Sequence, residues 1–379
     1  MSLKRVGVIG GGQLAWMMST EAKALGIELT VQTPSPQDPA VAVARKAIHA
    51  PVDEAMATAQ LANHCEVITF ENEFIDLPAL LKLAEEGICF RPSLKALSPL
   101  LDKYEQRIFL KNIGLPVPHF TILEPGQEIT SPFGFPAVLK ARRHGYDGKG
   151  TFIVKSQDEL TNTWETLGSP DILLEEYVPF QQELGVMAAR SLMGKVITYP
   201  VVETQQVEQV CRRVVAPAQV KPEVVSQVQV IATTLLEKLQ VVGIFGIELF
   251  LTADDQVLVN EIAPRTHNSG HFTLDACETS QFAMQLQTVA DLPLGSPHMK
   301  CPGAVMVNLL GYETSESDYQ GKRNQLQGIP QTYVYWYGKT QSRPGRKLGH
   351  VTTLLDSSDR GAALAMAKVI ESIWYGKKS

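Results

Sequence analysis

The segment that most restricts the fold of this chain is a glycine turn near its start. Residues 4–9 (KRVGVI) form an apolar run typical of a buried parallel strand, and Gly10–Gly12 follow it directly. Residues 13–26 then show helical spacing, and residues 27–33 (IELTVQT) return to a strand pattern. A strand, a glycine turn, a helix and a second strand in this order form the first unit of a doubly wound parallel sheet, so we expect an α/β fold.

The same turn raises the question of a bound dinucleotide. The spacing Gly10-x-Gly12-x-x-Ala15 loosely matches the dinucleotide fingerprint, which also needs an acid at the end of the second strand. That strand ends in Val31-Gln32-Thr33-Pro34, so nothing there can hold a ribose diol and NAD is disfavoured. A small phosphate monoester at the helix N-terminus remains compatible with the turn, because helix N–H groups and the helix dipole favour anions.

Length and composition limit the class of protein. The 379 residues exceed what one core usually spans, and 44% apolar with 20% charged residues is ordinary for a globular chain. A net charge of −6 argues against a general nucleic-acid binder. The start of the chain lacks the pattern of a signal peptide, no apolar run is long enough to cross a membrane, and the five cysteines form no CxxC. We therefore expect a cytoplasmic protein without membrane or nucleic-acid partners.

A further apolar strand, residues 66–70, is followed by Glu71-Asn72-Glu73. The carboxyl ends of strands in open α/β sheets are where ligands bind, although a solvated strand end would look the same. Helices are expected at 77–86 and 98–113, and we expect the first domain to comprise residues 1–102.

The next feature is a basic, glycine-rich loop between two strand-like runs. It reads KARRHGYDGKG from Lys140 to Gly150 and carries one acid, Asp147. Backbone N–H groups with lysine and arginine suit a polyphosphate, and a hairpin with a solvated basic face is the alternative. A lone carboxylate weakens anion binding, so Asp147 needs another purpose.

The segment 243–263 predicts a hairpin that turns at Asp254-Asp255. Glu248 lies six residues before Asp254 and Glu261 six after Asp255, so a symmetric hairpin sets them opposite each other. Like charges so placed repel, and a divalent cation such as Mg²⁺ between them removes the conflict; two exposed strand glutamates are the alternative. A zinc site at His267 and His271 is disfavoured, because Pro264 and the Asn-Ser-Gly between the histidines oppose a helix.

The remaining elements suggest an α+β central part and a small β-rich end. In the central part, strands are expected at 119–123, 137–141, 152–156, 172–178, 183–191 and 195–203, and helices at 157–167, 222–240 and 273–291. In the last part, strands are expected at 302–311, 331–339 and 351–356, and a helix at 358–374. The expected domain limits are 103–298 and 299–379. Lys339, Arg343, Arg346 and Lys347 form a last basic loop that suits a phosphate or is simply solvated.

Taken in order, these motifs resemble the ATP-grasp superfamily over nearly the full length. Within it the chain is similar to the N5-carboxyaminoimidazole ribonucleotide synthetases. The motifs that carry the similarity are GVIGGGQLAWM (7–17), TFENE (69–73), GFPAVLKARRHGYDGKG (134–150), LLEEYVPFQQELGV (173–186), NEIAPRTHNSGHFTLDAC (260–277) and GRKLGHVT (345–352). The chain departs from its relatives at Thr204-Gln205-Gln206-Val207, where a histidine is common, and we assign no nucleotide contact there.

The resemblance implies an enzyme that binds ATP, Mg²⁺, bicarbonate and 5-aminoimidazole ribonucleotide (AIR). The resemblance implies that Lys103 and Lys140 contact the ATP phosphates. The residues implied to close over these phosphates are Gly145, Tyr146, Asp147, Gly148, Lys149, Gly150 and Thr151. The adenine would be held by Glu175, Glu176, Tyr177 and Val178, and the ribose by Glu183. Glu248 and Glu261 would hold Mg²⁺, with Asn260 alongside. The implied AIR contacts are Gln13, Leu14, Lys339, Arg346 and Lys347 with its phosphate, and Glu73, His267 and Asn268 with its ribose and ring.

The implied reaction is the ATP-dependent carboxylation of the exocyclic amine of AIR through carboxyphosphate. Asp147 then has a purpose as general base, with Tyr146 shaping the substrate side. One alternative is another ATP-grasp ligase, such as a formate-dependent glycinamide ribonucleotide transformylase. Another is a catalytically silent nucleotide-binding protein, which the paired glutamates and Asp147 disfavour. The family also suggests a homodimer.

Overall fold

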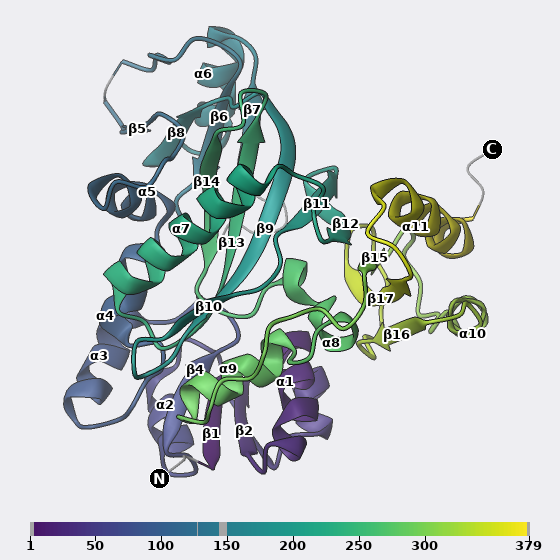
Figure 1. The fold of residues 1–379 in the computed structure, drawn as a ribbon. Helices are drawn as coiled ribbons and strands as arrows, with labels where there is room; N and C mark the ends of the chain where they lie inside the picture. Colours follow the sequence, from purple (N-terminus) through teal and green to yellow (C-terminus); the bar gives the residue numbers. More distant parts are fainter. Residues whose placement is uncertain (1–3, 127, 144–149, 377–379) are drawn as a thin grey trace.

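The computed structural model describes residues 4–126, 128–143 and 150–376. Three sheets organise the chain: a parallel sheet from its first part, a small antiparallel sheet, and a large sheet that runs from the middle of the chain to its end (Figure 1). The α/β class with an N-terminal parallel sheet, predicted from the sequence, is confirmed.

The N-terminal sheet has the order β3-β2-β1-β4, with all strands parallel. Its elements are β1 (Arg5–Ile9), α1 (Gln13–Ala24), β2 (Glu28–Thr33), η1 (Pro39–Ala42), β3 (Lys46–His49), α2 (Ala55–Ala62), β4 (Val67–Phe70) and α3 (Leu77–Glu85). The sequence predicted β1, α1, β2, β4 and α3 but missed β3 and α2. The strand β3 is short and half exposed, so it lacks the apolar run that marked the others.

The helix expected at 98–113 is divided in the structure. It consists of α4 (Leu94–Leu97), η2 (Ser98–Leu100) and α5 (Lys103–Asn112). The Asp102 carboxylate accepts the backbone N–H of Tyr104 at 2.9 Å, and this N-cap starts a new helix. Asp102 also pairs with Arg142 at 2.9 Å, so the start of α5 is fixed beside the strand that carries Lys140.

The small sheet is antiparallel, with the order β5-β8-β6-β7. Its elements are β5 (Phe120–Leu123), β6 (Ala137–Ala141), β7 (Thr151–Val154), α6 (Gln157–Thr166) and β8 (Ile172–Glu176). The strands β6 and β7 pair from Ala137↔Val154 to Lys140↔Thr151. The glycine-rich segment between them, residues 144–149, lies outside the described residues.

The large sheet has nine strands in the order β14-β13-β9-β11-β12-β15-β17-β16, with β10 also paired to β9. Its elements up to residue 263 are β9 (Phe180–Arg190), β10 (Val196–Thr198), β11 (Val202–Val207), β12 (Val210–Ala216), α7 (Pro222–Leu239), β13 (Gly243–Thr252) and β14 (Val257–Ala263). Figure 1 shows α7 lying across one face of β9, β13 and β14, where its apolar side chains join those of the strands in one core. The strand predicted at 195–203 is interrupted at Pro200, which cannot donate to the ladder.

The last part of the chain extends the same sheet rather than starting another. The remaining elements are η3 (Asn268–Gly270), α8 (Thr273–Ala276), α9 (Gln281–Val289), β15 (Gly303–Leu310), α10 (Gln320–Gln327), β16 (Thr332–Trp336), β17 (Lys347–Leu355) and α11 (Arg360–Tyr375). The strand β15 pairs with β12, so the sheet continues into the C-terminal region. The helix expected at 273–291 is divided, because Ser280 caps a new helix by accepting the N–H of Ala283.

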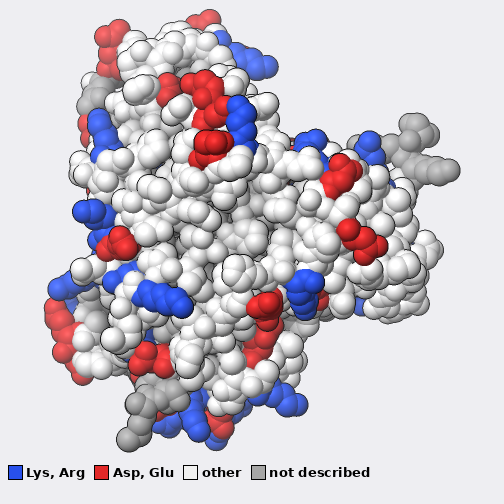
Figure 2. Space-filling model, in the orientation of Figure 1, with Lys and Arg blue, Asp and Glu red and all other residues white. Residues whose placement is uncertain are grey.

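The surface carries charges of both signs. On the face drawn in Figure 2, lysine and arginine alternate with aspartate and glutamate between broad uncharged areas, without an extended basic field. Within the described part of the chain, none of the helices is both long and apolar enough to cross a membrane.

Candidate active site

The hairpin of β13 and β14 places Glu248 directly opposite Glu261, as predicted. The turn is not the symmetric one that was assumed. Asp255 has a φ of +61°, and the ladder near the turn pairs Leu251 with Val257, one residue out of step with Glu248↔Glu261. A β-bulge at Asn260 absorbs that offset. The two glutamates therefore face each other because an off-centre turn and a bulge compensate.

The two carboxylates lie in unlike electrostatic surroundings. Burial raises the pKa of Glu248 to about 7, and the charge of Glu261 adds to that shift. Burial also acts on Glu261, but the charges of Lys103, Lys140 and His267 together outweigh it and lower the pKa of Glu261. The Nζ of Lys103 lies 2.7 Å from Oε1 of Glu261. The Nε2 of His267 lies 3.4 Å from Oε1 of Glu248. The two glutamates therefore lie beside Lys103 and His267, and Glu248 is the one of the two whose ionised form is disfavoured.

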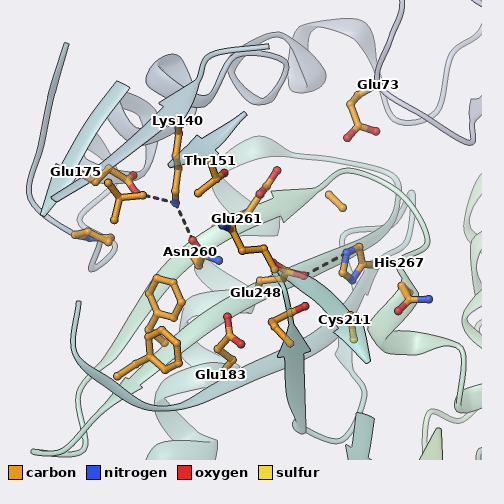
Figure 3. A pocket seen from close by; sticks show the side chains of 18 of the residues that line it. Glu73, Lys140, Thr151, Glu175, Glu183, Cys211, Glu248, Asn260, Glu261 and His267 are labelled. Carbon is orange, nitrogen blue, oxygen red and sulfur yellow. Dashed lines mark hydrogen bonds and ion pairs between the residues drawn. The ribbon is translucent and has the colours of Figure 1, made fainter. Parts of the chain in front are cut away.

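A buried ion network links the small sheet to this hairpin. Glu175 on β8 pairs with Arg107 of α5 and with Lys140 of β6, whose Nζ lies 2.7 Å from Oε2. Lys140 also donates to Oδ1 of Asn260 at 3.0 Å, and Arg107 donates to the carbonyl oxygen of Asn260 at 2.5 Å. Arg107 and Glu175 are each 2% exposed. Both cations therefore bridge the small sheet to the bulge of the large sheet. Figure 3 shows Lys140 between Glu175 and Asn260.

A cavity of about 590 Å³ lies between the two sheets and reaches the N-terminal sheet. Figure 3 shows Lys140 and Glu175 on one side, Glu183 and Glu248 on the floor, and Glu73 and His267 on the far side. The apolar part of its wall includes Val138, Ile153, Val178 and the stacked rings of Phe180 and Phe250, which lie 4.8 Å apart. Burial raises the pKa of Glu183 to about 7.

The far side of the cavity combines three parts of the chain. Arg265 forms a two-point ion pair with Glu73, with distances of 2.7 and 3.2 Å. Lys339 donates to Oε1 of Gln13 at 2.9 Å and to the carbonyl oxygen of Lys347 at 2.8 Å. Residues from the first sheet, from the loop after β14 and from the C-terminal region therefore meet at one place.

The structure brings most of the predicted site residues to this cavity. The described residues among them that line it are Gln13, Leu14, Glu73, Lys140, Thr151, Glu175, Glu176, Tyr177, Val178, Glu183, Glu248, Asn260, Glu261, His267, Asn268 and Lys347. Lys103 reaches it through Glu261, Lys339 through Gln13, and Gly150 through its neighbour Thr151. Arg346 does not line it and donates to the carbonyl oxygen of Gln341 at 2.7 Å. Gly145, Tyr146, Asp147, Gly148 and Lys149 lie outside the described residues.

The start of the helix after the glycine turn, considered above for a phosphate, has a partner within the chain. The backbone N–H of Leu14 donates to Oε1 of Glu71 at 3.0 Å. The carboxylate at the end of β4 therefore already occupies the helix N-terminus.

Several lining or supporting residues were missed from the sequence. Arg107 lies four residues after Lys103, and this spacing on one helix face could have indicated a paired role. Arg265 lies within the APRTHNSGH motif but received no role. Gln206, Gln209 and Cys211 come from the β11–β12 hairpin and line the cavity, although no nucleotide contact was assigned to that segment.

The zinc alternative finds no support in the part of the chain that the structure describes. His271 is fully buried, its Nδ1 lies 3.0 Å from Nε2 of Gln281, and its ring lies beside His350. Among the described residues, no group of three or more histidine, cysteine or acidic side chains is placed to hold a metal ion. A cation at Glu248 and Glu261 would take its other ligands from phosphate and water.

A cavity between two antiparallel sheets, with lysines on one side and paired glutamates on the other, defines an ATP-grasp enzyme. Family models agree: an ATP-grasp domain matches residues 108–282, a ribonucleotide synthetase preATP-grasp domain matches 3–99, and a phosphoribosylaminoimidazole carboxylase C-terminal domain matches 304–364. The N5-carboxyaminoimidazole ribonucleotide synthase of Synechococcus elongatus is 53% identical over 98% of this chain and 96% of its own length.

Solved structures give the same result. An ADP complex of an N5-carboxyaminoimidazole ribonucleotide synthetase is 33% identical, covers 99% of this chain and 98% of its own, and has a TM-score of 0.91. The Aspergillus clavatus enzyme in complex with ADP and 5-aminoimidazole ribonucleotide is 30% identical, with 98% of each chain covered and a TM-score of 0.90. The chain belongs to the N5-carboxyaminoimidazole ribonucleotide synthase family.

Proposed function

We propose that this enzyme carboxylates AIR at its exocyclic amine, consuming ATP and bicarbonate and releasing ADP and phosphate, in purine biosynthesis. The observation that carries the proposal is the single cavity. It joins the lysines and glutamates suited to a nucleotide with a second group, Gln13, Glu73 and Lys347, suited to a phosphorylated acceptor. A protein that only bound a nucleotide would not need this second group.

The nucleotide side of the cavity supports the roles expected for ATP. Lys140 and Lys103 supply positive charge next to Asn260 and Glu261, where the phosphates would lie. The end of β8, from Glu175 to Val178, borders the apolar wall and would hold the adenine, while Glu183 would contact the ribose. The carboxylate of Glu175 itself is committed to Lys140 and Arg107, so adenine recognition would use the backbone there.

Mg²⁺ fits the residues present. Glu248 and Glu261 are ladder partners, and burial together with the charge of Glu261 raises the pKa of Glu248 to about 7, so a cation beside the pair would favour the ionised form of both. These two carboxylates would hold the ion, with Asn260 beside them. When bound, Mg²⁺ would neutralise charge on the transferring phosphoryl group.

The chemistry follows from the inertness of bicarbonate, whose carbon is stabilised by its oxygens. A bicarbonate oxygen attacks the γ-phosphorus of ATP, ADP leaves, and carboxyphosphate forms. Lys103 and Lys140 stabilise the spreading negative charge. Carboxyphosphate releases CO₂ and phosphate; the exocyclic amine of AIR attacks the carbon and loses its proton to a base. Glu73, His267 and Asn268 would orient AIR, and Asn268 is held by two hydrogen bonds with Asn308 at 3.0 and 2.7 Å.

We propose Asp147 as the base and Tyr146 as a residue that shapes the substrate side, because a polyphosphate loop does not otherwise need an acid. Asp147→Asn should lower the rate of AIR carboxylation by about 10²–10⁴ and leave the KM for ATP nearly unchanged. Initial rates of product formation at varied ATP check both values. Near-normal carboxylation by the variant would exclude Asp147 as the base.

The acceptor is tested by incubating the enzyme with ATP and each candidate pair of substrates. We expect ADP release to be stimulated by AIR with bicarbonate and not by glycinamide ribonucleotide with formate. Stimulation by the second pair would support the transformylase alternative, which the family comparison does not favour. Release that no acceptor stimulates would support the silent nucleotide-binding alternative.

We also infer that the enzyme works in the cytoplasm as a homodimer. Support comes from the five cysteines, which form no CxxC, and from what the family resemblance implies. Light scattering on the purified protein measures the assembly, and a monomer at working concentration would contradict it.

A further inference from the structure

The glycine turn after β1 encloses a carboxylate that the reaction scheme does not use. Glu71, at the end of β4, accepts the backbone N–H of Gly12 at 2.6 Å and those of Leu14 and Ala15 at 3.0 and 3.4 Å. The side chain is buried, yet it belongs to the cavity wall. A helix N-terminus attracts anions, and here the protein provides the anion itself.

The glycines of the turn are fitted to this carboxylate. A Cβ on Gly12 would lie 2.6 Å from Oε1 of Glu71, and one on Gly10 would lie 2.5 Å from Oε2. Gly10 also has a φ of +117°, which side chains rarely adopt. Gly10 and Gly12 are therefore needed where Glu71 fills the space that their side chains would take, whereas a Cβ on Gly11 would meet Thr33.

Two residues with an expected role in AIR binding, Gln13 and Glu73, are close in sequence to Gly12 and Glu71. Gln13 is the first residue of α1, directly after Gly12, and its side chain accepts from Lys339. Glu73 lies two residues after Glu71 and pairs with Arg265. Burial raises the pKa of Glu71, while the three N–H donors and the charge of Arg265 favour its ionised form.

We propose that Glu71 is a positioning residue for AIR. By closing the N-terminal turn of α1, its carboxylate fixes Gln13 toward Lys339 and holds Glu73 against Arg265, so both ends of the AIR site are set by one side chain. Because Glu71 already satisfies the helix N-terminus, the charge of the substrate phosphate is balanced by lysine side chains and not by the helix. This inference rests on the proposed function.

Glu71→Gln tests it with almost no change in size. Both carboxylate oxygens of Glu71 accept from the turn, but glutamine has one oxygen and one NH₂ group. The NH₂ group would therefore face a backbone N–H of the turn. We expect the KM for AIR to rise at least tenfold, while the KM for ATP stays within twofold. Gly12→Ala, which pushes Glu71 aside without removing it, should raise the KM for AIR in the same selective way.

Glu66→Gln is the matched control. Glu66 also accepts two backbone N–H groups, from Lys4 and Arg5 at 3.0 Å each, at the opposite end of the same sheet and away from the cavity. We expect it to leave both KM values unchanged. Variants of Glu71 with a lowered melting temperature but an unchanged KM for AIR would overturn the inference, since the role would then be structural only.

The outcomes also separate this inference from the proposed function. If the wild-type enzyme shows no AIR-stimulated ADP release, the proposed function fails. If it does, and Glu71→Gln and Gly12→Ala bind AIR normally, only the role of Glu71 fails. Loss of folding in both variants would likewise count against it, because the carboxylate would then be a requirement of the fold.

Discussion

Replacing Glu261 with glutamine should lower the rate of AIR-dependent ADP release by about a thousandfold. The substitution removes one of two carboxylates that face each other across the hairpin and takes away the partner of Lys103 at 2.7 Å. Charge stabilisation of a transferring phosphoryl group amounts to several kcal/mol, and each 1.36 kcal/mol is about tenfold in rate. Steady-state ADP release at saturating ATP, bicarbonate and AIR measures the effect.

The same hairpin provides the control for that variant. Asp254 lies in the exposed turn and accepts the hydroxyl of Thr252 at 2.5 Å, so Asp254→Asn should keep nearly full activity. Glu248→Gln should resemble Glu261→Gln. If Glu261→Gln retained more than a tenth of the wild-type rate, the paired glutamates would not be the cation site.

Removing the carboxylate of Glu175 should have the largest effect on stability. Glu175→Ala leaves Arg107 and Lys140 buried without their shared counter-charge. Breaking a buried pair in this way costs about 3–5 kcal/mol in the free energy of unfolding. Urea unfolding at neutral pH measures the loss. The adjacent Glu176 is half-buried and accepts the N–H of His119 at 2.8 Å, with no ion pair to another described residue, so Glu176→Ala should lose far less.

Acid gives an independent check of the same network. Burial alone would raise the pKa of Glu175, but the charges of Arg107 and Lys140 outweigh it and lower the pKa to about 2, from an ordinary value of 4.5. A lowered folded-state pKa means stability that is present above pH 4.5 and lost as pH falls toward 2. The wild type should lose stability through that range, and Glu175→Ala should lose less. Parallel losses in both proteins would show that Glu175 does not carry the effect.

The elements that sequence predicted best were those whose signal is local. The glycine turn after β1 and the helical spacing of α7 led directly to the observed elements. The predicted pairing of Glu248 with Glu261 was also correct, although two register offsets compensated for each other. The assumed turn was one residue off, and the bulge at Asn260, which a symmetric count cannot include, restored the register.

Contacts between residues that are far apart in the sequence could not be predicted. Glu71 and Gly12 lie 59 positions apart, and Arg107 and Asn260 are separated by 153. Each alone looks ordinary: an acid at a strand end, and a basic residue on a helix. Only the fold shows that one closes the helix N-terminus and the other bridges two sheets. This is why the glycine turn was predicted as a phosphate site, although part of it is occupied by the protein.

The most direct test of the proposed carboxylation is to follow ¹³C-bicarbonate by NMR in the presence of ATP and AIR. We predict that the label appears in a carbamate on the exocyclic nitrogen of the ribonucleotide, with one ADP and one phosphate released for each carbamate. Omission of ATP should abolish the signal. ADP release with all the label remaining as bicarbonate, or label on a ring carbon instead of the amine, would contradict the proposed carboxylation.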